Sequence, residues 1–187
     1  MSSSTNGLTI NSAITLPNSP HRIPRLGFGV YDSPPPTCVN SCLKAFQAGY
    51  RHVDTAQYYA NESSVGRSVR ESKLPRSEIF ITSKILSPGN DVDSAYKQII
   101  DSVKKLDGEN GYVDLFLIHS PNGGKESREL MWKALEKAKE QGKVRDIGVS
   151  NYGKGHIEEI KGFGGTWPPA VNQIEVRIYC GSGSLIL

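Results

Sequence analysis

Six polar residues with complementary chemistry stand at or near the ends of short apolar runs along the sequence. They offer a carboxylate, an ammonium, an imidazole, a hydroxyl and two amides, and they are Asp54, Lys84, His119, Ser150, Asn151 and Gln173. Each alone has a structural explanation, such as a helix cap, a solvated charge or a satisfied core histidine. In parallel βα architectures, however, the carboxyl ends of the strands meet at one rim, where active sites are built. Together the six residues therefore predict an active site.

The chemistry that suits this set is proton donation to a carbonyl group. Two tyrosines, Tyr58 and Tyr59, follow Asp54 in the stretch HVDTAQYYANE, and a phenol stays protonated at neutral pH because its pKa is about 10. A nearby ammonium lowers that pKa, so Lys84 is expected to tune the phenol while Asp54 keeps the lysine charged. Neutral His119 is expected to orient the substrate oxygen by donating a hydrogen bond. These residues alone do not decide which tyrosine donates the proton.

A hydride donor is also needed, because no protein side chain supplies a hydride. A reduction at this rim would therefore require a nicotinamide cofactor. Its carboxamide needs hydrogen-bond partners, and the later strand ends provide suitable ones in Ser150, Asn151 and Gln173.

The elements that must position these groups follow a repeating pattern. Short β-type runs alternate with longer runs of helical period, which is typical of βα units and a parallel sheet. Six strands are predicted, at residues 26–30, 51–54, 79–84, 113–119, 144–150 and 170–175. A β-hairpin formed by residues 13–16 and 21–24 is predicted before them, with its prolines in the turn or at an edge. Six units fit either an open doubly wound sheet or part of a (β/α)8 barrel.

Helices are predicted between the strands, from stripes of apolar residues that begin at Cys38, Val92 and Leu130. Asn61 is expected to cap a helix that runs to residue 71, and Asp91 to cap the helix after it, because short polar side chains satisfy free amides at helix starts. The glycine-rich stretches complete neither a dinucleotide fingerprint nor a phosphate loop. A doubly wound hydrolase or transferase is therefore disfavoured.

The bulk composition narrows the class of protein further. At 187 residues, one domain over 1–187 is the default, and the 22 basic and 19 acidic residues are scattered, so no nucleic-acid partner is indicated. Without a long apolar stretch or a signal-like start, a cytoplasmic protein with no membrane partner is expected. The three cysteines support neither a disulfide framework nor a metal site, so reduced thiols are expected.

In its motifs the sequence resembles the aldo-keto reductases, which are NADPH-dependent carbonyl reductases built on a (β/α)8 barrel. The motifs are GFGVY at 27–31, DTA at 54–56, YANE at 59–62, ITSK at 81–84, DLFLIH at 114–119, GVSNY at 148–152 and NQIE at 172–175. The resemblance implies a catalytic tetrad of Asp54, Tyr59, Lys84 and His119. Because the family places its acid five residues after the aspartate, Tyr59 is expected to be the proton donor and Tyr58 a residue of the pocket edge.

The resemblance also implies a cofactor site for NADPH or NADP and a pocket for a small carbonyl substrate. The expected cofactor-binding residues are Val30, Asp54, Ser150, Asn151 and Gln173. The expected substrate-binding residues are Tyr31, His119 and Ser120. Many relatives carry a bulky aromatic residue at the position of Ser120, so a roomier or more polar pocket is expected here.

The sequence departs from the family at its carboxyl end. A complete barrel takes about 250 residues and eight strands, whereas this sequence offers six βα units and then an atypical tail at residues 176–187. We expect a barrel without its last two units, weak NADPH binding and poor turnover. Two functions stay open: an NADPH-dependent oxidoreductase that reduces aldehydes or ketones, or a catalytically impaired family member that acts, if at all, by binding a partner. No oligomeric state is predicted.

Overall fold

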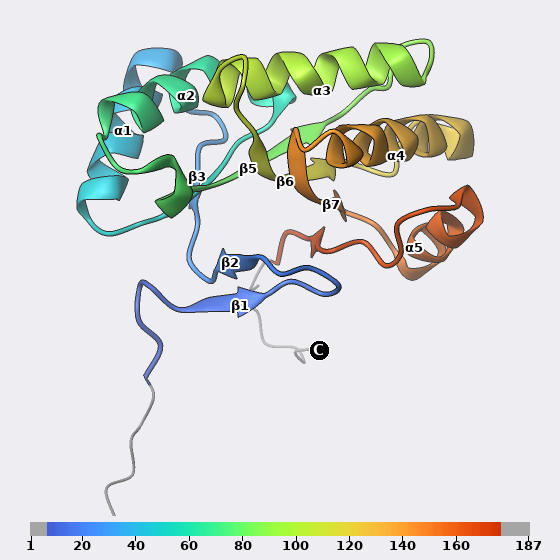
Figure 1. Ribbon diagram of the computed structural model, residues 1–187, viewed down its shortest axis with the longest axis horizontal. Helices are drawn as coiled ribbons and strands as arrows, with labels where there is room; N and C mark the ends of the chain where they lie inside the picture. Colours follow the sequence, from blue (N-terminus) through green and yellow to red (C-terminus); the bar gives the residue numbers. More distant parts are fainter. Residues whose placement is uncertain (1–6, 177–187) are drawn as a thin grey trace, which may run out of the picture.

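The computed structural model describes residues 7–176 and has a parallel sheet at its centre (Figure 1). Each strand pairs with the next one along the chain, so the strand order never reverses. A doubly wound sheet requires such a reversal, whereas a (β/α)8 barrel does not. The strands are β3 (Phe28–Gly29), β4 (His52–Asp54), β5 (Phe80–Ile85), β6 (Val113–Ile118), β7 (Val144–Ser150) and β8 (Asn172–Gln173). The six predicted strands and the incomplete barrel are confirmed.

The helices follow the strands and form an arc around the outside of the curled sheet (Figure 1). Within the described residues they are α1 (Pro35–Gln47), α2 (Glu62–Glu71), α3 (Val92–Asp107), α4 (Gly124–Glu140) and α5 (Lys154–Ile160). Their apolar stripes pack on the outward side chains of the sheet, such as Val53, Ile81 and Phe116, in one buried cluster. The helical periodicity of the sequence thus predicted α1, α3 and α4 correctly.

Strand alternation directs the polar side chains to the other face of the sheet. Successive side chains of a strand point to opposite faces, so the residues on either side of Val53 and Ile81 face the barrel interior. This places Asp54 and Lys84 inside the barrel, at the carboxyl ends of their strands.

The hairpin covers the other end of the interior. β1 (Ala13–Thr15) pairs antiparallel with β2 (Arg22–Pro24), as predicted, and lies on the side of the sheet away from α1 to α3 (Figure 1). Leu16 and Ile23 pack against Leu115 and Leu117 inside the barrel. The hairpin is therefore fixed to the amino-terminal end of the barrel, opposite the predicted site.

Of the two predicted helix caps, one is correct and one is wrong. The Asp91 carboxylate accepts a hydrogen bond from the Ser94 amide at 2.7 Å, as expected of a cap. Asn61 occupies the N-cap position of α2, but its side chain makes no capping hydrogen bond. The Asn61 side chain is instead buried against neighbouring loops, whose polar groups use its hydrogen-bonding capacity.

Several other features bear on the sequence predictions. Cys38 and Cys42 are buried free thiols, and Cys180 lies outside the described residues, as does the predicted tail beyond Val176. Within residues 7–176, no group of ligand side chains could hold a metal ion. No helix in this part of the chain is long and apolar enough to cross a membrane.

Gly66 provides a test of how closely α2 and α3 pack. A Cβ atom at Gly66 would lie 2.1 Å from the carbonyl oxygen of Lys105, so Gly66→Ala must force the two helices apart. We expect this change to lower the free energy of unfolding by about 2 kcal/mol or more. Gly155→Ala on α5 meets no atom within 4 Å, so it is expected to raise the free energy by about 0.5 kcal/mol. Urea unfolding of both variants measures this, and equal effects would contradict the described packing.

Candidate active site

An open cavity of about 1060 Å³ runs along the interior face of the sheet. One end of the cavity lies at the hairpin, near Ile14 and Ile23, and the other lies at the carboxyl ends of the strands. Seven residues predicted for the site line this cavity: Tyr31, Asp54, Tyr59, His119, Ser150, Asn151 and Gln173. The fold therefore brings most of the predicted set together.

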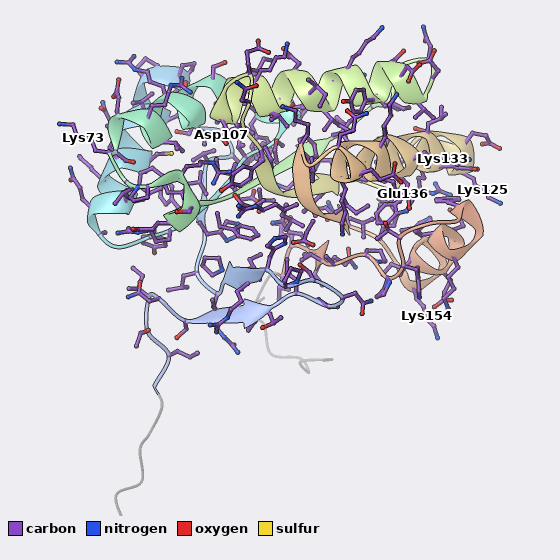
Figure 2. All side chains as sticks on the ribbon, in the orientation of Figure 1. Lys73, Asp107, Lys125, Lys133, Glu136 and Lys154 are labelled. Carbon is purple, nitrogen blue, oxygen red and sulfur yellow. The ribbon has the colours of Figure 1, made fainter. Side chains whose placement is uncertain are left out.

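Lys84 does not line the cavity, and its ammonium group is buried in the interior. The labelled lysines of Figure 2, such as Lys73 and Lys154, project from the outside of the molecule, whereas Lys84 is only 1% exposed. Its Nζ donates hydrogen bonds to Asp54 Oδ1 at 2.5 Å and to the Thr55 carbonyl at 3.0 Å. Burial lowers the pKa of Lys84, and the charge of Asp54 opposes that shift.

Asp54 connects the ends of three strands at the site. One of its carboxylate oxygens binds Lys84, and the other accepts a hydrogen bond from Gln173 Nε2 at 2.8 Å. Asp54 ends β4, Lys84 lies on β5 and Gln173 ends β8. This carboxylate therefore connects two neighbouring strands with a strand from the other end of the strand order. A single carboxylate thus holds a charge and an amide at the edge of the cavity.

Tyr59 is the tyrosine that reaches this pair. Lys84 Nζ lies 3.4 Å from the Tyr59 hydroxyl, and the Tyr59 ring packs edge-on against His119 with centroids 5.6 Å apart. Tyr58, by contrast, is 64% exposed and lies at the rim with its ring 6.2 Å from that of His119. Within the described structure, the phenol beside the ammonium is therefore that of Tyr59.

The ionisation of Tyr59 differs from the expectation based on the sequence. Burial, followed by the nearby charge of Asp54 and by Tyr31, raises the pKa of Tyr59 to about 12. The predicted lowering by Lys84 is not found, because burial dominates the pKa of the phenol. The ammonium beside the phenol is itself paired with Asp54.

His119 directly follows β6 and completes the group. Burial and then the charge of Lys84 lower its pKa, so the imidazole is neutral at pH 7, as predicted for an oxygen-orienting group. Its Nδ1 is buried without a hydrogen-bond partner among the described residues. Its carbonyl accepts a hydrogen bond from Asn151 Nδ2 at 3.1 Å, which fixes the loop after β7 beside it.

The three remaining lining residues leave polar atoms available to a ligand. Asn151 Nδ2 donates to Ser150 Oγ, and Gln173 Nε2 donates to Asp54. Among the described residues, nothing binds the amide oxygens of Asn151 and Gln173 or takes the hydroxyl proton of Ser150. Two acceptors and one donor match a carboxamide, which offers an NH₂ group and one acceptor oxygen. The residues present therefore fit the carboxamide of a nicotinamide.

Two predicted site residues lie elsewhere. Val30 is 1% exposed and its side chain packs in the core between the sheet and the helices rather than facing the cavity. Ser120 is half-buried, and its hydroxyl accepts a hydrogen bond from the Asn122 amide without lining the cavity. Tyr31, in contrast, is 67% exposed, and its ring centroid lies 5.0 Å from that of Tyr59.

His52 is a lining residue that the sequence reasoning missed. It is buried, lines the same cavity as Asp54, and hydrogen-bonds through Nε2 to Thr82 Oγ1 at 2.9 Å. The signal was present, because residues two apart on a strand face the same side of a sheet. His52 lies two residues before Asp54 on β4 and therefore shares its face.

Comparison with known proteins places the chain in a family. The model of the "Aldo/keto reductase family" matches residues 26–183. An uncharacterised oxidoreductase of Schizosaccharomyces pombe is 40% identical over 176 residues, which is 90% of this chain and 61% of that protein. The 9,11-endoperoxide prostaglandin H2 reductase of Trypanosoma cruzi is 40% identical over 170 residues, or 89% of this chain and 57% of that protein.

Comparison with solved structures identifies the same family. The aldo/keto reductase of Brucella melitensis has a TM-score of 0.81 and 40% identity, covering 88% of this chain and 63% of that chain. An aldo-keto reductase of Bombyx mori in complex with NADP has a TM-score of 0.78 and 29% identity, covering 90% of this chain and 59% of that chain. The chain spans about three fifths of the length of these curated relatives and solved structures. With its family motifs, its strand order and these matches in agreement, the chain belongs to the aldo/keto reductase family.

Proposed function

We propose that the chain takes part in the NADPH-dependent reduction of aldehydes or ketones to alcohols, with Tyr59 as the proton donor. The observation that carries the proposal is that Tyr59 and His119 line one cavity, with Lys84 next to the Tyr59 hydroxyl and three groups with free hydrogen-bonding capacity nearby. The Bombyx mori relative solved with NADP supports the choice of cofactor.

Tyr59 supplies the proton. Since its pKa is about 12, the phenol holds its proton throughout the neutral range. As the carbonyl oxygen gains negative charge, the hydroxyl proton moves to that oxygen and a phenolate is left on Tyr59. Lys84 Nζ, 3.4 Å from this oxygen, then stabilises the phenolate with its third N–H, because its other two bind Asp54 and Thr55.

His119 orients the carbonyl. A neutral imidazole carries one N–H, and donation of that N–H to the substrate oxygen places the oxygen beside the phenol. The same hydrogen bond stabilises charge that develops on the oxygen during the reaction. A protonated His119 would add a positive charge beside Lys84, which the low pKa of the imidazole avoids.

The cofactor would be held through its carboxamide by Ser150, Asn151 and Gln173. When bound, the reduced nicotinamide supplies the hydride that the carbonyl carbon receives. Gln173 has a second role, because its amide nitrogen binds Asp54. Contact between the carboxamide and the Gln173 oxygen would therefore connect the cofactor to the carboxylate that keeps Lys84 charged.

Exchange of the two tyrosines for phenylalanine tests the proton donor. We expect Tyr59→Phe to reduce aldehyde-dependent oxidation of NADPH by at least about 100-fold, because the general acid is lost. NADPH affinity, measured by fluorescence titration, should stay unchanged because the ring remains. The matched control is Tyr58→Phe, whose hydroxyl has no partner among the described residues, and it should keep the parent rate. If the unchanged chain binds NADPH but does not oxidise it with an aldehyde, or if the two changes have equal effects, the alternative of a catalytically impaired binding protein is favoured.

The depressed pKa of His119 makes a prediction about pH. The folded chain favours the neutral imidazole, so this contribution to stability is complete above the ordinary pKa of 6.5 and is lost as the pH falls below it. In NMR titrations, the ring signal of His119 should have its midpoint below pH 6.5. The loss of thermal stability between pH 7 and pH 5 should be smaller in His119→Gln, with a remainder from His52, whose pKa is also lowered by burial. A midpoint of His119 above pH 6.5 would contradict the described environment.

A further inference from the structure

The backbone around Tyr59 is held in an unfavourable conformation. Tyr59 ends the short 3₁₀ turn η1 (Gln57–Tyr59), and Ala60 after it has φ 54° and ψ 23°, in the left-handed region. A residue with a side chain stays in this region only where surrounding contacts enforce it. The Tyr59 ring is only half-buried, so contacts from other side chains are expected to help fix the turn.

Asn61, the next residue, makes such contacts with a fully used side chain. It is 2% exposed, and its Nδ2 donates to the Val30 carbonyl at 2.8 Å and to the Ser33 carbonyl at 3.1 Å. Its Oδ1 accepts from the Thr55 hydroxyl at 2.7 Å. Both amide hydrogens and the amide oxygen are therefore occupied, and none of these bonds serves as a cap for α2.

The partners of Asn61 belong to the segments that surround the phenol. Val30 and Ser33 flank Tyr31, whose ring lies against that of Tyr59. Thr55 offers its carbonyl to Lys84 Nζ at 3.0 Å, and its own amide donates to the Thr82 carbonyl at 2.9 Å. One buried amide thus joins the loop after β3, the loop after β4 and the end of the Tyr59 turn.

We propose that Asn61 is a positioning residue that holds the Tyr59 hydroxyl within hydrogen-bonding reach of Lys84. The inference rests on the proposed function, since it gives Asn61 a role in the work of Tyr59. The distance from Lys84 Nζ to the Tyr59 hydroxyl is 3.4 Å, close to the limit of a hydrogen bond, so a small displacement of the turn breaks it. Asn61 itself touches neither the cavity nor Lys84.

Gln57 secures the opposite end of the turn but is a weaker candidate. Its Nε2 donates to the Gln98 carbonyl and to Ser102 Oγ, both on α3, and its side chain is half-buried. These bonds tie the turn to an outer helix. They do not reach the loop that carries Tyr31 or the strand that carries Lys84, which are the groups that contact Tyr59.

Two variants and one control separate positioning from general stability. Asn61→Ala removes all three hydrogen bonds, whereas Thr55→Val removes only the hydroxyl that donates to Asn61 Oδ1 and keeps the shape of the side chain. Ser68→Ala is the control, because its buried hydroxyl donates to the Val65 carbonyl within α2 and contacts none of these loops. The three proteins are compared at temperatures that lie equally far below their thermal unfolding midpoints.

The first measurement is the ionisation of the Tyr59 phenol, followed by NMR of ¹³Cζ-labelled tyrosine in the 187-residue chain. Burial is the main cause of the Tyr59 pKa of about 12, so release of the turn toward water should lower it. We expect a decrease toward the ordinary value of about 10 in Asn61→Ala, a smaller decrease in Thr55→Val and none in Ser68→Ala. This readout requires no catalysis, so it tests the inference even if Tyr59→Phe leaves turnover unchanged and the proposed function fails.

The second measurement is turnover. In Asn61→Ala, aldehyde-dependent oxidation of NADPH should decrease by at least about tenfold with unchanged NADPH affinity, because small misplacements of a catalytic group have large effects on rate. If Asn61→Ala does not fold, Thr55→Val tests the proposal in its place, and we expect a smaller decrease in turnover. A parent-like Tyr59 ionisation in the folded variants, or an equal decrease in Ser68→Ala, would overturn the proposal while leaving the role of Tyr59 intact.

Discussion

Lys84 places an ammonium group where almost no water reaches, and a buried charge is stable only when it is paired and fully hydrogen-bonded. Its three N–H groups point to Asp54, the Thr55 carbonyl and the Tyr59 hydroxyl. The second oxygen of Asp54 binds Gln173. The hydrogen bonds that stabilise this one lysine therefore connect the ends of β4, β5 and β8 with the Tyr59 turn η1. The arrangement of the site follows from this one requirement.

Burial explains the ionisation state of the proposed proton donor. Because the phenol of Tyr59 is partly buried and lies near the Asp54 carboxylate, its pKa is raised and it keeps its proton. A hydroxyl of this kind does not release a proton to water at neutral pH. In the proposed reaction it gives up the proton only to an oxygen that is gaining charge beside it, and Lys84 then has an N–H directed at the phenolate. Neutral His119, directly after β6, would offer the second hydrogen bond to that oxygen.

The parts that could be predicted from the sequence are those fixed by backbone periodicity. Alternation along β4 and β5 is enough to place Asp54 and Lys84 on the interior face, and the family spacing singled out Tyr59. Loop side chains follow no such rule: Asn61 has the residue type of a helix cap, yet its amide is used by carbonyl groups of a loop distant in sequence. The pKa of Tyr59 could not be predicted from the sequence either, because it depends mainly on how far the fold buries the phenol.

We propose that a nicotinamide binds at the carboxyl-terminal end of the cavity rather than at its hairpin end. Titration of the ¹⁵N-labelled chain with NADP⁺, followed by backbone amide chemical shifts, locates the binding site and detects weak binding. We expect the shift changes to concentrate at His119, Asn151 and Gln173. Changes confined to the hairpin end of the cavity, around Ile14 and Ile23, or no change at all, would contradict it.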